Sequence, residues 1–561
     1  MGTEERYDFV IVGAGHNGTT AAAYLAKCGL SVCVLEERQE CGGAQENVEP
    51  IPGVRLSPCA TVFYAAASPG LKQLELWKYG FRISPGAGLF TLQKRWERGL
   101  LTTEGAVPIT EKDAMGFAKL SGLLAQPPFI NELLRATFWT PPPPPEVEVA
   151  AENTPFMQVY KERQPDVWTR ELLEMTLFDL LDEYCETEPF KVTMAVGSWY
   201  SGSAGHYEGV AIPALAYNIA VTLSSQLAVP QGGHHNYYHA IFRAAQAHGV
   251  VFHTCCPVDE ILINNGRAIG VRLRDDSALG EKKIWADKAV ISATDVKQTF
   301  LKLIGPQHLD ASFMQRIKDL SVKGSSVWVN HFLTYERLRP RPKFGEIESA
   351  IYPCDSREIY YDLVADAEGR KGNPTIPPER VQWVWYSPPR LAPKDPQCTI
   401  PHRYVEGPFY FYLPPPEYHV ESPDAINKNK DKMNAYILQA LSQVFENLDS
   451  DNIVYHWSNT PYDQEFRHRA LIGGGYGGLR HCKDQMWNQR PLPELSRYRT
   501  PIDGLYLCHQ TSGHPGALCL MAIPYNLMHI LIEDGIAEPG DWWYASPWYI
   551  PQQGKISAIP R

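Results

Sequence analysis

The chain has 561 residues, of which 44% are hydrophobic and 20% are charged, so it can bury a sizeable core, and we expect two closely joined domains. Its net charge of −11, without a long run of Lys or Arg, argues against a nucleic-acid-binding surface. The 12 cysteines include no pair with the C-x-x-C spacing of a zinc or thioredoxin-like site, so we expect free thiols and no bound metal.

The N-terminal segment gives no sign of a targeting signal. No charged leader with an apolar core precedes the first predicted strand, and no apolar run reaches the roughly 18 residues needed to cross a bilayer. Arg6 stands where a myristoylation site needs Ser or Thr. We therefore expect an intracellular, cytoplasmic protein with no transmembrane segment and no nucleic-acid partner.

The first forty residues read as strand, turn, helix and strand. Residues 8–12 are a short apolar run, residues 19–28 an Ala-rich stretch typical of a tightly packed helix, and residues 31–35 a second apolar run. This order predicts a βαβ unit with a parallel sheet.

The turn between the first strand and the helix fits the pattern G-x-G-x-x-G, with Gly13, Gly15 and Gly18 at its three glycine positions. Gly13 permits a tight turn, Gly15 lets the backbone approach a pyrophosphate, and Gly18 lets the helix pack on the strand. The helix N-terminus then offers free N–H groups and a partial positive charge to that pyrophosphate. The pattern predicts a dinucleotide-binding site.

An acidic residue follows at the end of the second strand. Glu36, eighteen positions after Gly18, is placed to accept both hydroxyls of an adenosine ribose and to repel a 2′-phosphate. The adjacent Glu37 competes for the same role. Directly after them come Arg38 and a second glycine pair, Gly42 and Gly43, followed by Ala44. A second close backbone approach suits the longer flavin dinucleotide, so this pair favours FAD over NAD.

The middle of the chain predicts a second unit. Residues 141–145 are five consecutive prolines, which predict an extended spacer or surface turn; a loop inside the domain is favoured over a partner-binding motif. Residues 325–333, 381–386 and 409–413 are rich in β-branched and aromatic residues and predict strands of a second sheet. Residues 424–447 place Met433, Ile437, Leu441 and Val444 at helical spacing and predict an amphipathic helix.

Several segments resemble one family. The N-terminal signature of residues 8–44 and 52–57 is similar to that of the phytoene desaturase-type flavoproteins, within the amine-oxidase-like superfamily. The resemblance continues at residues 230–233, 248–250, 258–261, 266–271, 289–295, 473–478, 484–486, 490–491, 501–508 and 514–517, and covers about half of the chain.

This resemblance implies an α/β fold with a Rossmann-type FAD-binding domain around a parallel sheet. The domain is assembled from residues 1–80, 225–300 and 460–561, and residues 81–224 and 301–459 form a mixed α+β substrate-binding domain. In such proteins the backbone of the residue matching Val258 holds the adenine. The segment with Gly516 and Ala517 closes over the flavin side.

Two histidines are candidates for catalysis. His514 lies in the segment that resembles the flavin-side motif, where an imidazole could donate to the flavin or handle a proton, although a ring that caps a loop carbonyl is the favoured alternative. His235 follows His234 and Gly232-Gly233 and could face the substrate cavity; an exposed pair at a helix start is favoured. His509 stands where the family usually has glycine. Either its side chain reshapes the pocket, or the loop shifts to accommodate it.

The resemblance implies an FAD-dependent oxidoreductase, a desaturase, dehydrogenase or oxidase, that removes hydrogen from an apolar, aromatic or polyene small molecule. Three alternatives stay open: a redox-neutral flavin-dependent isomerase, a protein that keeps FAD only structurally, and a non-enzymatic carrier like the Rab GDP-dissociation inhibitors. Residues 541–549 contain five aromatic residues, which suit a homodimer contact, a peripheral membrane contact or, as we favour, the chain's own surface.

Overall fold

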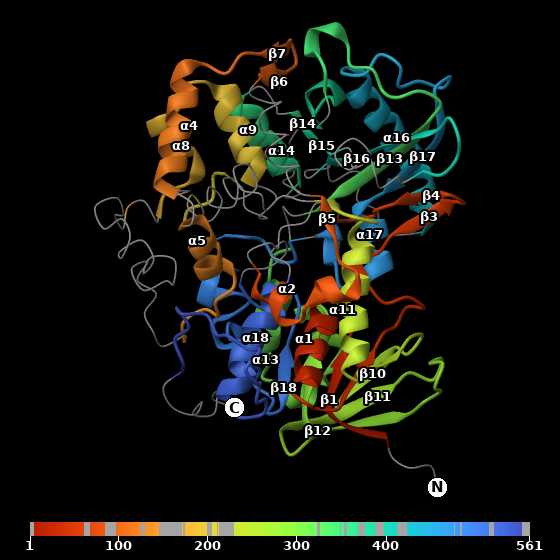
Figure 1. The fold of residues 1–561 in the computed structure, drawn as a ribbon, viewed down its shortest axis with the longest axis vertical. Coiled ribbons are helices and arrows are strands. Elements are labelled where there is room, and N and C mark those ends of the chain that lie inside the picture. The colour runs from red at the N-terminus through yellow and green to blue at the C-terminus, as the bar shows by residue number, and fades with distance from the viewer. Residues whose placement is uncertain are drawn as a thin grey trace.

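The structure, a computed structural model, contains two large sheets with helices packed around each, and three two-stranded sheets (Figure 1). It describes the following residues: 5–60, 68–84, 97–124, 129–144, 171, 174–198, 205–209, 211, 229–322, 326–347, 349–352, 356–367, 376–386, 398–411, 423–475, 477–482, 485–514 and 521–552.

The sheet nearer the N-terminus has seven strands in the order β10-β11-β12-β1-β2-β9, with β18 paired to β12. Strands β12, β1, β2, β9 and β18 run parallel, and β10 and β11 add an antiparallel edge. The bounds are β1 (Glu5–Val12), β2 (Val32–Leu35), β9 (Val251–His253), β10 (Val258–Asn264), β11 (Arg267–Leu273), β12 (Lys283–Ser292) and β18 (Leu505–Leu507). The predicted α/β fold with a parallel sheet drawn from distant segments is confirmed, while the domain boundaries stay a prediction.

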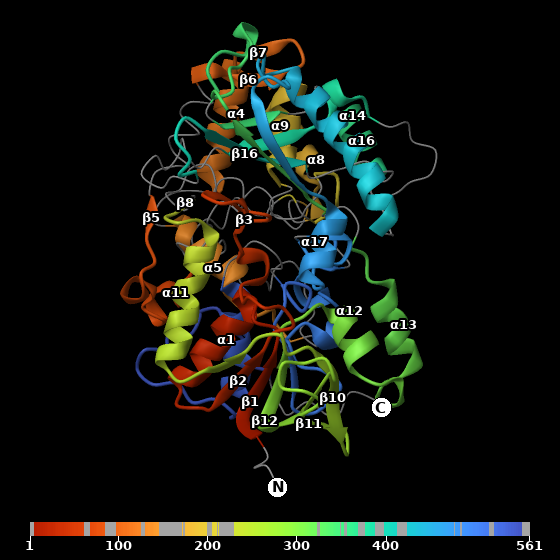
Figure 2. The ribbon, with the colours of Figure 1, turned by 90° about the vertical axis from the view of Figure 1, so that its right-hand side faces the viewer.

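Both faces of this sheet are covered, because the residues of β1 alternate between two cores. Phe9 and Ile11 pack in the core that contains α1, α11 and α18, whereas Val10 and Val12 pack in the core that contains α13. A strand buried on both faces reads as a continuous apolar run, as residues 8–12 do. Figure 2 shows α1 and α11 side by side on the left, and α12 and α13 on the right. The bounds are α1 (His16–Lys27), α11 (His234–Ala247), α12 (Val296–Gln298), α13 (Ala311–Asp319) and α18 (Ala522–Glu533).

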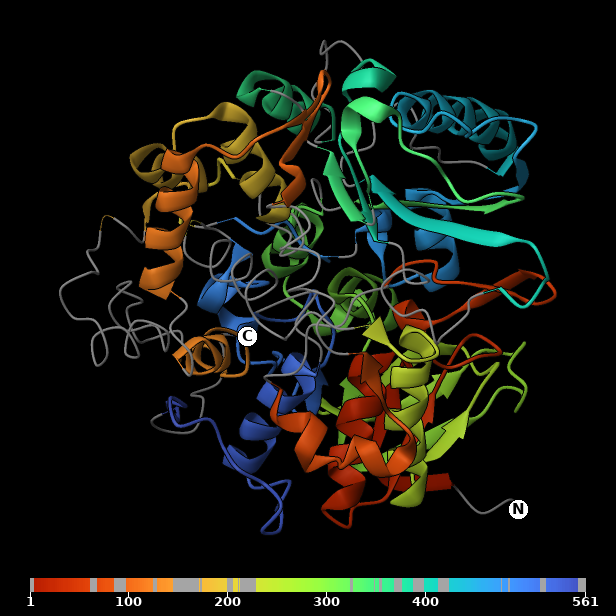
Figure 3. The same cartoon turned by 45° about the horizontal axis from the view of Figure 1, so that its top comes forward.

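The second sheet is antiparallel and has the order β14-β15-β16-β13-β17 (Figures 1 and 3). The bounds are β13 (Trp328–Thr334), β14 (Ser349–Tyr352), β15 (Trp383–Tyr386), β16 (Tyr404–Phe411) and β17 (Ile453–Asn459). Strands β13, β15 and β16 confirm the three predicted runs, apart from residues 325 and 412–413, which lie outside the described residues. Their aromatic side chains pack into a core, with Trp385 stacked on Phe409 at 5.3 Å between ring centroids.

The predicted helix over residues 424–447 is present but shorter. α16 (Pro423–Ser442) ends before Val444, although Met433, Ile437, Leu441 and Val444 are all buried. The chain leaves the helix because its next residues pair with another segment. The carbonyl of Val444 accepts from the N–H of Arg341 at 2.8 Å, and Phe445 forms a β-bridge with Pro340.

The remaining helices and hairpins lie between and around the two sheets (Figure 3). They are α2 (Pro69–Gln73), α4 (Glu111–Leu124), α5 (Phe129–Phe138), α8 (Leu177–Tyr184), α9 (Glu188–Ser198), α14 (Arg357–Ala367), α17 (Pro461–His468), and the pairs β3 (Val48–Ile51) with β4 (Val54–Leu56), β5 (Ile83–Ser84) with β8 (Val229–Pro230), and β6 (Leu100–Thr102) with β7 (Gly105–Val107). Among the helices in the described parts of the chain, none is long and apolar enough to cross a membrane.

The proline run is non-helical, as predicted, but it does not form a surface turn. Residues 141–144 are extended and buried, while the fifth proline lies outside the described residues. C-terminal groups cover them: the guanidinium of Arg497 donates to the carbonyl of Pro142 at 2.7 Å, and Thr140 bonds to Ser546 at 2.5 Å. The run is therefore an internal loop.

Candidate cofactor-binding site

Each glycine of the N-terminal turn has a different environment. Gly13 has φ +100°, a conformation that favours glycine. A Cβ on Gly18 would lie 2.2 Å from the carbonyl oxygen of Gly13 and 2.8 Å from Cβ of Ala293. The close packing of the helix on the strand therefore requires glycine at position 18. A Cβ on Gly15 would meet nothing within 4 Å. The turn therefore packs inward at Gly18 and opens outward at Gly15.

The opening leads to the uncapped N-terminus of α1. Gly15 is the N-cap, no side chain of the described residues bonds to the first-turn N–H groups, and the first turn contains no acidic residue. Burial lowers the pKa of His16, in that turn, to about 4, so its ring is neutral at neutral pH. Free N–H groups at the positive end of a helix form a ready site for a phosphate.

A partly open pocket lies at this turn and along the ends of the parallel strands. Most of the predicted cofactor residues line it: Gly13, Gly15, Glu36, Glu37, Gly43, Ala44 and Val258. Ligands of open parallel sheets bind in a crevice at this edge. The unfilled space at Gly15 and the free helix N-terminus fit the diphosphate of a dinucleotide.

The two adjacent acids of the strand end differ in environment. Glu36 accepts from the N–H groups of Ala14 and Arg38, both at 2.9 Å, so its carboxylate is fixed against the glycine turn. Burial raises its pKa, while these two N–H groups oppose the rise. Glu37 is more exposed and lies 3.7 Å from Arg274. The geometry favours Glu36 over Glu37 as the ribose-binding carboxylate, although the role itself stays a prediction.

The second glycine pair packs on the first turn. The N–H of Gly42 donates to the carbonyl of Ala14 at 3.0 Å, and Gly42 forms a β-bridge with Gly15. Gly43 has φ +55°, and a Cβ there would lie 3.1 Å from Cα of Gly15. Gly43 and Ala44 therefore extend the pocket wall, whereas Gly42 holds the two turns together.

His234 and His235 begin α11, as predicted, but they are not an exposed pair. His234 is 1% exposed and bonds to the side chain of Gln45, and His235 lies 2.8 Å from Glu40 and 3.1 Å from the carbonyl of Gln45. The loop that carries Gly42 and Gly43 folds back on this helix and covers both rings. The expectation of exposure is wrong for this physical reason, and catalysis by His235 stays a prediction.

A buried carboxylate beside the pocket pairs with two arginines. Glu46 is 2% exposed and lies 2.6 Å from Arg38, 2.7 Å from Arg467 and 3.4 Å from His468, whose pKa burial lowers to about 4. Burial alone would raise the pKa of Glu46, but these neighbours hold it below its usual 4.5. Because Arg38 and Arg467 also line the pocket, they place positive charge beside the predicted diphosphate site.

The sequence interpretation missed several pocket residues. They are His16, Asn17, Gln298, Arg467, His468, Arg469 and Gln510, whereas His509 lines the pocket as one of its two sequence interpretations expected. The basic tripeptide at residues 467–469 was an available signal, because it lies just before the glycine-rich segment of residues 473–478.

A buried arginine ties the C-terminal loops together. Arg490 is 1% exposed, and its guanidinium donates to the carbonyls of Gly477, Leu479, Gln485, Gln510 and Gly513 at 2.9–3.3 Å. A planar guanidinium with five donors suits such a ring of acceptors. It therefore holds the loop of Gly477, Leu479 and Gln485 against the loop of Gln510 and Gly513, beside the pocket.

His514 caps a carbonyl in the described structure. Its Nε2 lies 2.7 Å from the carbonyl oxygen of Thr137 and donates to it, because a carbonyl oxygen can only accept a hydrogen bond. Its ring stacks on Trp487 with 4.0 Å between the ring centroids. Burial lowers its pKa to about 3, so the ring is neutral and its proton is on Nε2. Its catalytic role stays a prediction, and Gly516 and Ala517 lie outside the described residues.

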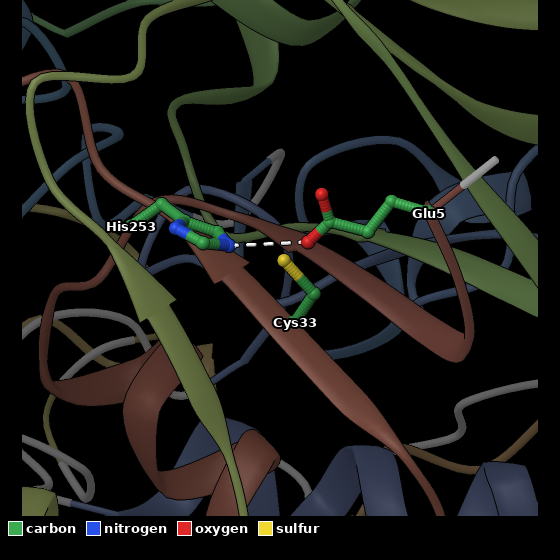
Figure 4. A group of neighbouring side chains, drawn as sticks. All are labelled: Glu5, Cys33 and His253. Atoms are coloured by element: carbon green, nitrogen blue, oxygen red, sulfur yellow. Dashed lines mark hydrogen bonds and ion pairs between the residues drawn. The ribbon is translucent and has the colours of Figure 1, made fainter. Parts of the chain in front are cut away.

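A cluster with metal-ligand chemistry lies on the same sheet, away from the pocket-lining residues. Glu5, Cys33 and His253 bring one ligand atom each within 4.8 Å of one another, and Figure 4 shows the Cys33 thiol beside the Glu5–His253 contact. Glu5 is already compensated by an ion pair with Lys282 and by the hydroxyl of Tyr7 at 2.8 Å. Burial raises the pKa of Cys33, which keeps the thiol protonated. We interpret the cluster as structural.

The aromatic C-terminal tail docks on the chain's own surface, as we favoured. Trp542 stacks on Tyr24 of α1 at 6.0 Å, and Trp543 packs 5.0 Å from Tyr525 of α18. The ring of His529 contacts Trp543 at 5.2 Å. The tail therefore braces α1 against α18.

Comparisons with known proteins agree with this geometry. Residues 11–78 match the NAD(P)-binding Rossmann-like domain family. The chain is 25% identical over 574 residues to pyridine nucleotide-disulfide oxidoreductase domain-containing protein 2 of Rattus norvegicus, with 94% of each chain covered. It is 23% identical over 567 residues to one of the subunits of limonene dehydrogenase from Castellaniella defragrans, with 97% of each covered.

Among solved structures, a putrescine oxidase mutant with redesigned cofactor binding has the same fold, with a TM-score of 0.57, 15% identity, and coverage of 94% of this chain and 98% of that one. The narrower resemblance to the phytoene desaturase type stays a prediction. The chain is therefore similar over nearly its whole length to proteins named as oxidoreductases, contains a Rossmann-like segment, and shares its fold with putrescine oxidase.

Proposed function

We propose that the protein is an FAD-dependent oxidoreductase that removes hydrogen from an apolar or conjugated small molecule. The observation that carries this proposal is the pocket at Gly15, where the missing side chain opens onto the free N-terminus of α1 beside the fixed carboxylate of Glu36. Bound FAD would supply the two-electron acceptor for hydrogen removal.

The described residues divide the binding of FAD between them. The N–H groups at the start of α1 would bind the diphosphate, with Arg38 and Arg467 adding positive charge. Glu36 would accept from the adenosine ribose, and the backbone at Val258 would border the adenine. Gly43 extends the pocket beyond the first turn, which supports the longer FAD over NAD.

The substrate class rests on a relative. Limonene is an apolar terpene, and the protein named for its dehydrogenation matches this chain over nearly the whole length of both. The aromatic strands β13, β15 and β16 do not add to this support, because their large side chains are packed in the core. The apolar substrate is therefore proposed from the relative and from the family resemblance.

The chain's own contribution to proton transfer is small in the described part of the site. His514 is neutral and its proton is committed to the carbonyl of Thr137. Removal of hydrogen from carbon by a flavin enzyme does not require a catalytic triad. The protein would then act chiefly by binding, orienting and shielding the reacting groups.

The first measurement is the absorbance of the purified protein at about 450 nm, the position of the flavin band. We expect a yellow protein whose band bleaches under anaerobic conditions with limonene or a polyene and not with putrescine, and whose product has lost two hydrogens. A colourless protein that cannot be loaded with FAD would refute the proposal. Product isomers without bleaching would replace it by isomerisation, and bleaching by the amine would move the substrate class to amines.

A further inference from the structure

His509 lies beside the first turn of α1. It follows the end of β18, where the thiol of the preceding Cys508 lies 3.7 Å from the carbonyl of Asn17. His509 is 7% exposed and lines the same pocket as Gly15 and His16. Its residual surface therefore borders the place where a dinucleotide diphosphate would lie against α1.

The hydrogen bonds of His509 fix its tautomer. The backbone N–H of Thr511 donates to Nδ1 of His509 at 3.3 Å. The hydroxyl of Thr511, which accepts from the N–H of Val296 at 2.9 Å, also lies 2.9 Å from this Nδ1. An Nδ1 that accepts from a backbone N–H carries no proton, so the neutral ring carries it on Nε2.

The ring is neutral and its remaining donor is uncommitted to the described chain. Burial lowers the pKa of His509 to about 3, and the nearby His16 adds to this effect. Among the described residues none bonds to Nε2, and the residue lines the pocket and keeps 7% of its surface exposed.

We propose that His509 is a positioning residue for the cofactor, whose Nε2–H donates to an oxygen of the diphosphate–ribityl chain. This inference rests on the proposed function. The backbone of His509 separately holds the loop, because its N–H donates to Ser512 Oγ at 2.7 Å and its carbonyl accepts from the N–H of Ser512 at 2.8 Å. Replacing the side chain therefore leaves these loop bonds in place.

The test measures FAD affinity of the apoprotein by flavin fluorescence for wild type, His509→Ala and His509→Gln. Gln places an amide N–H near the position of Nε2, whereas Ala has no donor. A lost hydrogen bond to a charged group predicts about 10- to 100-fold weaker FAD binding by His509→Ala. We expect His509→Gln to stay within about threefold. Both variants lose the Nδ1 contacts with Thr511, so their apoprotein Tm should fall by similar amounts, and only the FAD affinity should separate them. The control is His308→Ala, which removes an exposed imidazole from residues 306–308.

Shorter ligands identify the accepting oxygen. If the diphosphate accepts, His509→Ala weakens ADP as well as FAD; if the ribityl chain accepts, it weakens FAD alone. Adenosine, which has no phosphate, should bind equally to wild type and variant, and equal weakening of adenosine would overturn the inference, as would FAD binding by His509→Ala within about twofold of wild type. Equal loss in the Gln and Ala variants would also overturn it, because the donor would not be the cause. If wild-type apoprotein itself does not bind FAD, the proposed function fails first.

Discussion

Substitution of two glycines in the same turn should separate cofactor binding from folding. A Cβ at Gly15 meets nothing within 4 Å, whereas a Cβ at Gly18 would lie 2.2 Å from the carbonyl oxygen of Gly13. We therefore expect Gly15→Ser to weaken FAD binding without unfolding the apoprotein. Gly18→Ala should destabilise the apoprotein itself, because α1 must move away from β1.

The magnitudes follow from local structure. At Gly15, the N-cap with φ −70° and ψ 174°, Ser is at least as good a cap as Gly, so the apoprotein should change by only a few tenths of a kcal/mol. At Gly18, Ala gains about 1 kcal/mol of helix propensity, but overpacking against backbone typically costs about 1–3 kcal/mol or more. We expect a net loss of about 1–2 kcal/mol for Gly18→Ala. Gly15→Ser should weaken FAD binding at least about tenfold, or about 1.4 kcal/mol.

The assay compares apoprotein thermal melts with FAD titrations of the same samples. Gly122→Ala in α4 is the matched control, because a Cβ there also meets nothing within 4 Å and the residue is helical. This control should raise the free energy of unfolding by up to about 1 kcal/mol and leave FAD affinity unchanged. The reasoning is refuted if Gly15→Ser lowers the apoprotein Tm as much as Gly18→Ala does, or if it binds FAD as tightly as wild type.

Three further predictions concern charge and the tail. Glu36→Gln should weaken FAD binding about 10- to 100-fold, since a charge-assisted hydrogen bond is lost. In the apoprotein, burial raises the pKa of Glu36, so the folded wild type binds more protons than the unfolded chain. Glu36→Gln should therefore gain stability relative to wild type as the pH rises above the usual Glu pKa of 4.5. A difference in Tm between variant and wild type that is the same at every pH would contradict this. Glu46→Gln should lose about 3–5 kcal/mol near about pH 7 in urea unfolding, because Arg38 and Arg467 are left beside an uncharged group. The pKa of Glu46 is lowered, so this stabilisation is present above the usual 4.5 and is lost as pH falls through the folded pKa; a pH-independent loss would contradict the ion-pair assignment. Deletion of residues 541–561 should lower the Tm through the loss of the ring contacts to Tyr24 and Tyr525, and leave the elution volume in size-exclusion chromatography changed only by the lost mass. A dimer that dissociates on deletion would instead assign the tail to a contact between protomers.

The sequence predicted the first βαβ unit well because its signals are local. The strand, the glycine turn, the helix and Glu36 lie within residues 5–36, and each glycine has the environment that its position in the pattern implies. Strands β13, β15 and β16 of the second sheet were also predicted, since aromatic and β-branched residues mark a buried antiparallel strand on their own, whereas β14 and β17 were not.

The rest of the pocket depended on contacts between distant segments. Arg467 meets Glu46 across more than four hundred residues, and the tautomer of His509 depends on Thr511, which is itself held by Val296. No spacing rule connects such partners. For the same reason the covering of His234 could not be read from the sequence, because it follows from the way the loop at Gln45 folds back on α11.

The two acids beside the pocket have opposite electrostatic situations, and the difference bears on function. Glu46 is paired with two arginines that stabilise its charge, so its contribution is structural and complete without a ligand. Glu36 accepts from two backbone N–H groups and is near the charge of Arg38, but burial still raises its pKa, so its charged form is incompletely compensated in the described protein. Hydroxyl donors from a bound ribose would supply the missing stabilisation. An incompletely compensated carboxylate that borders an open pocket is therefore better explained as a ligand-binding group than as part of the core.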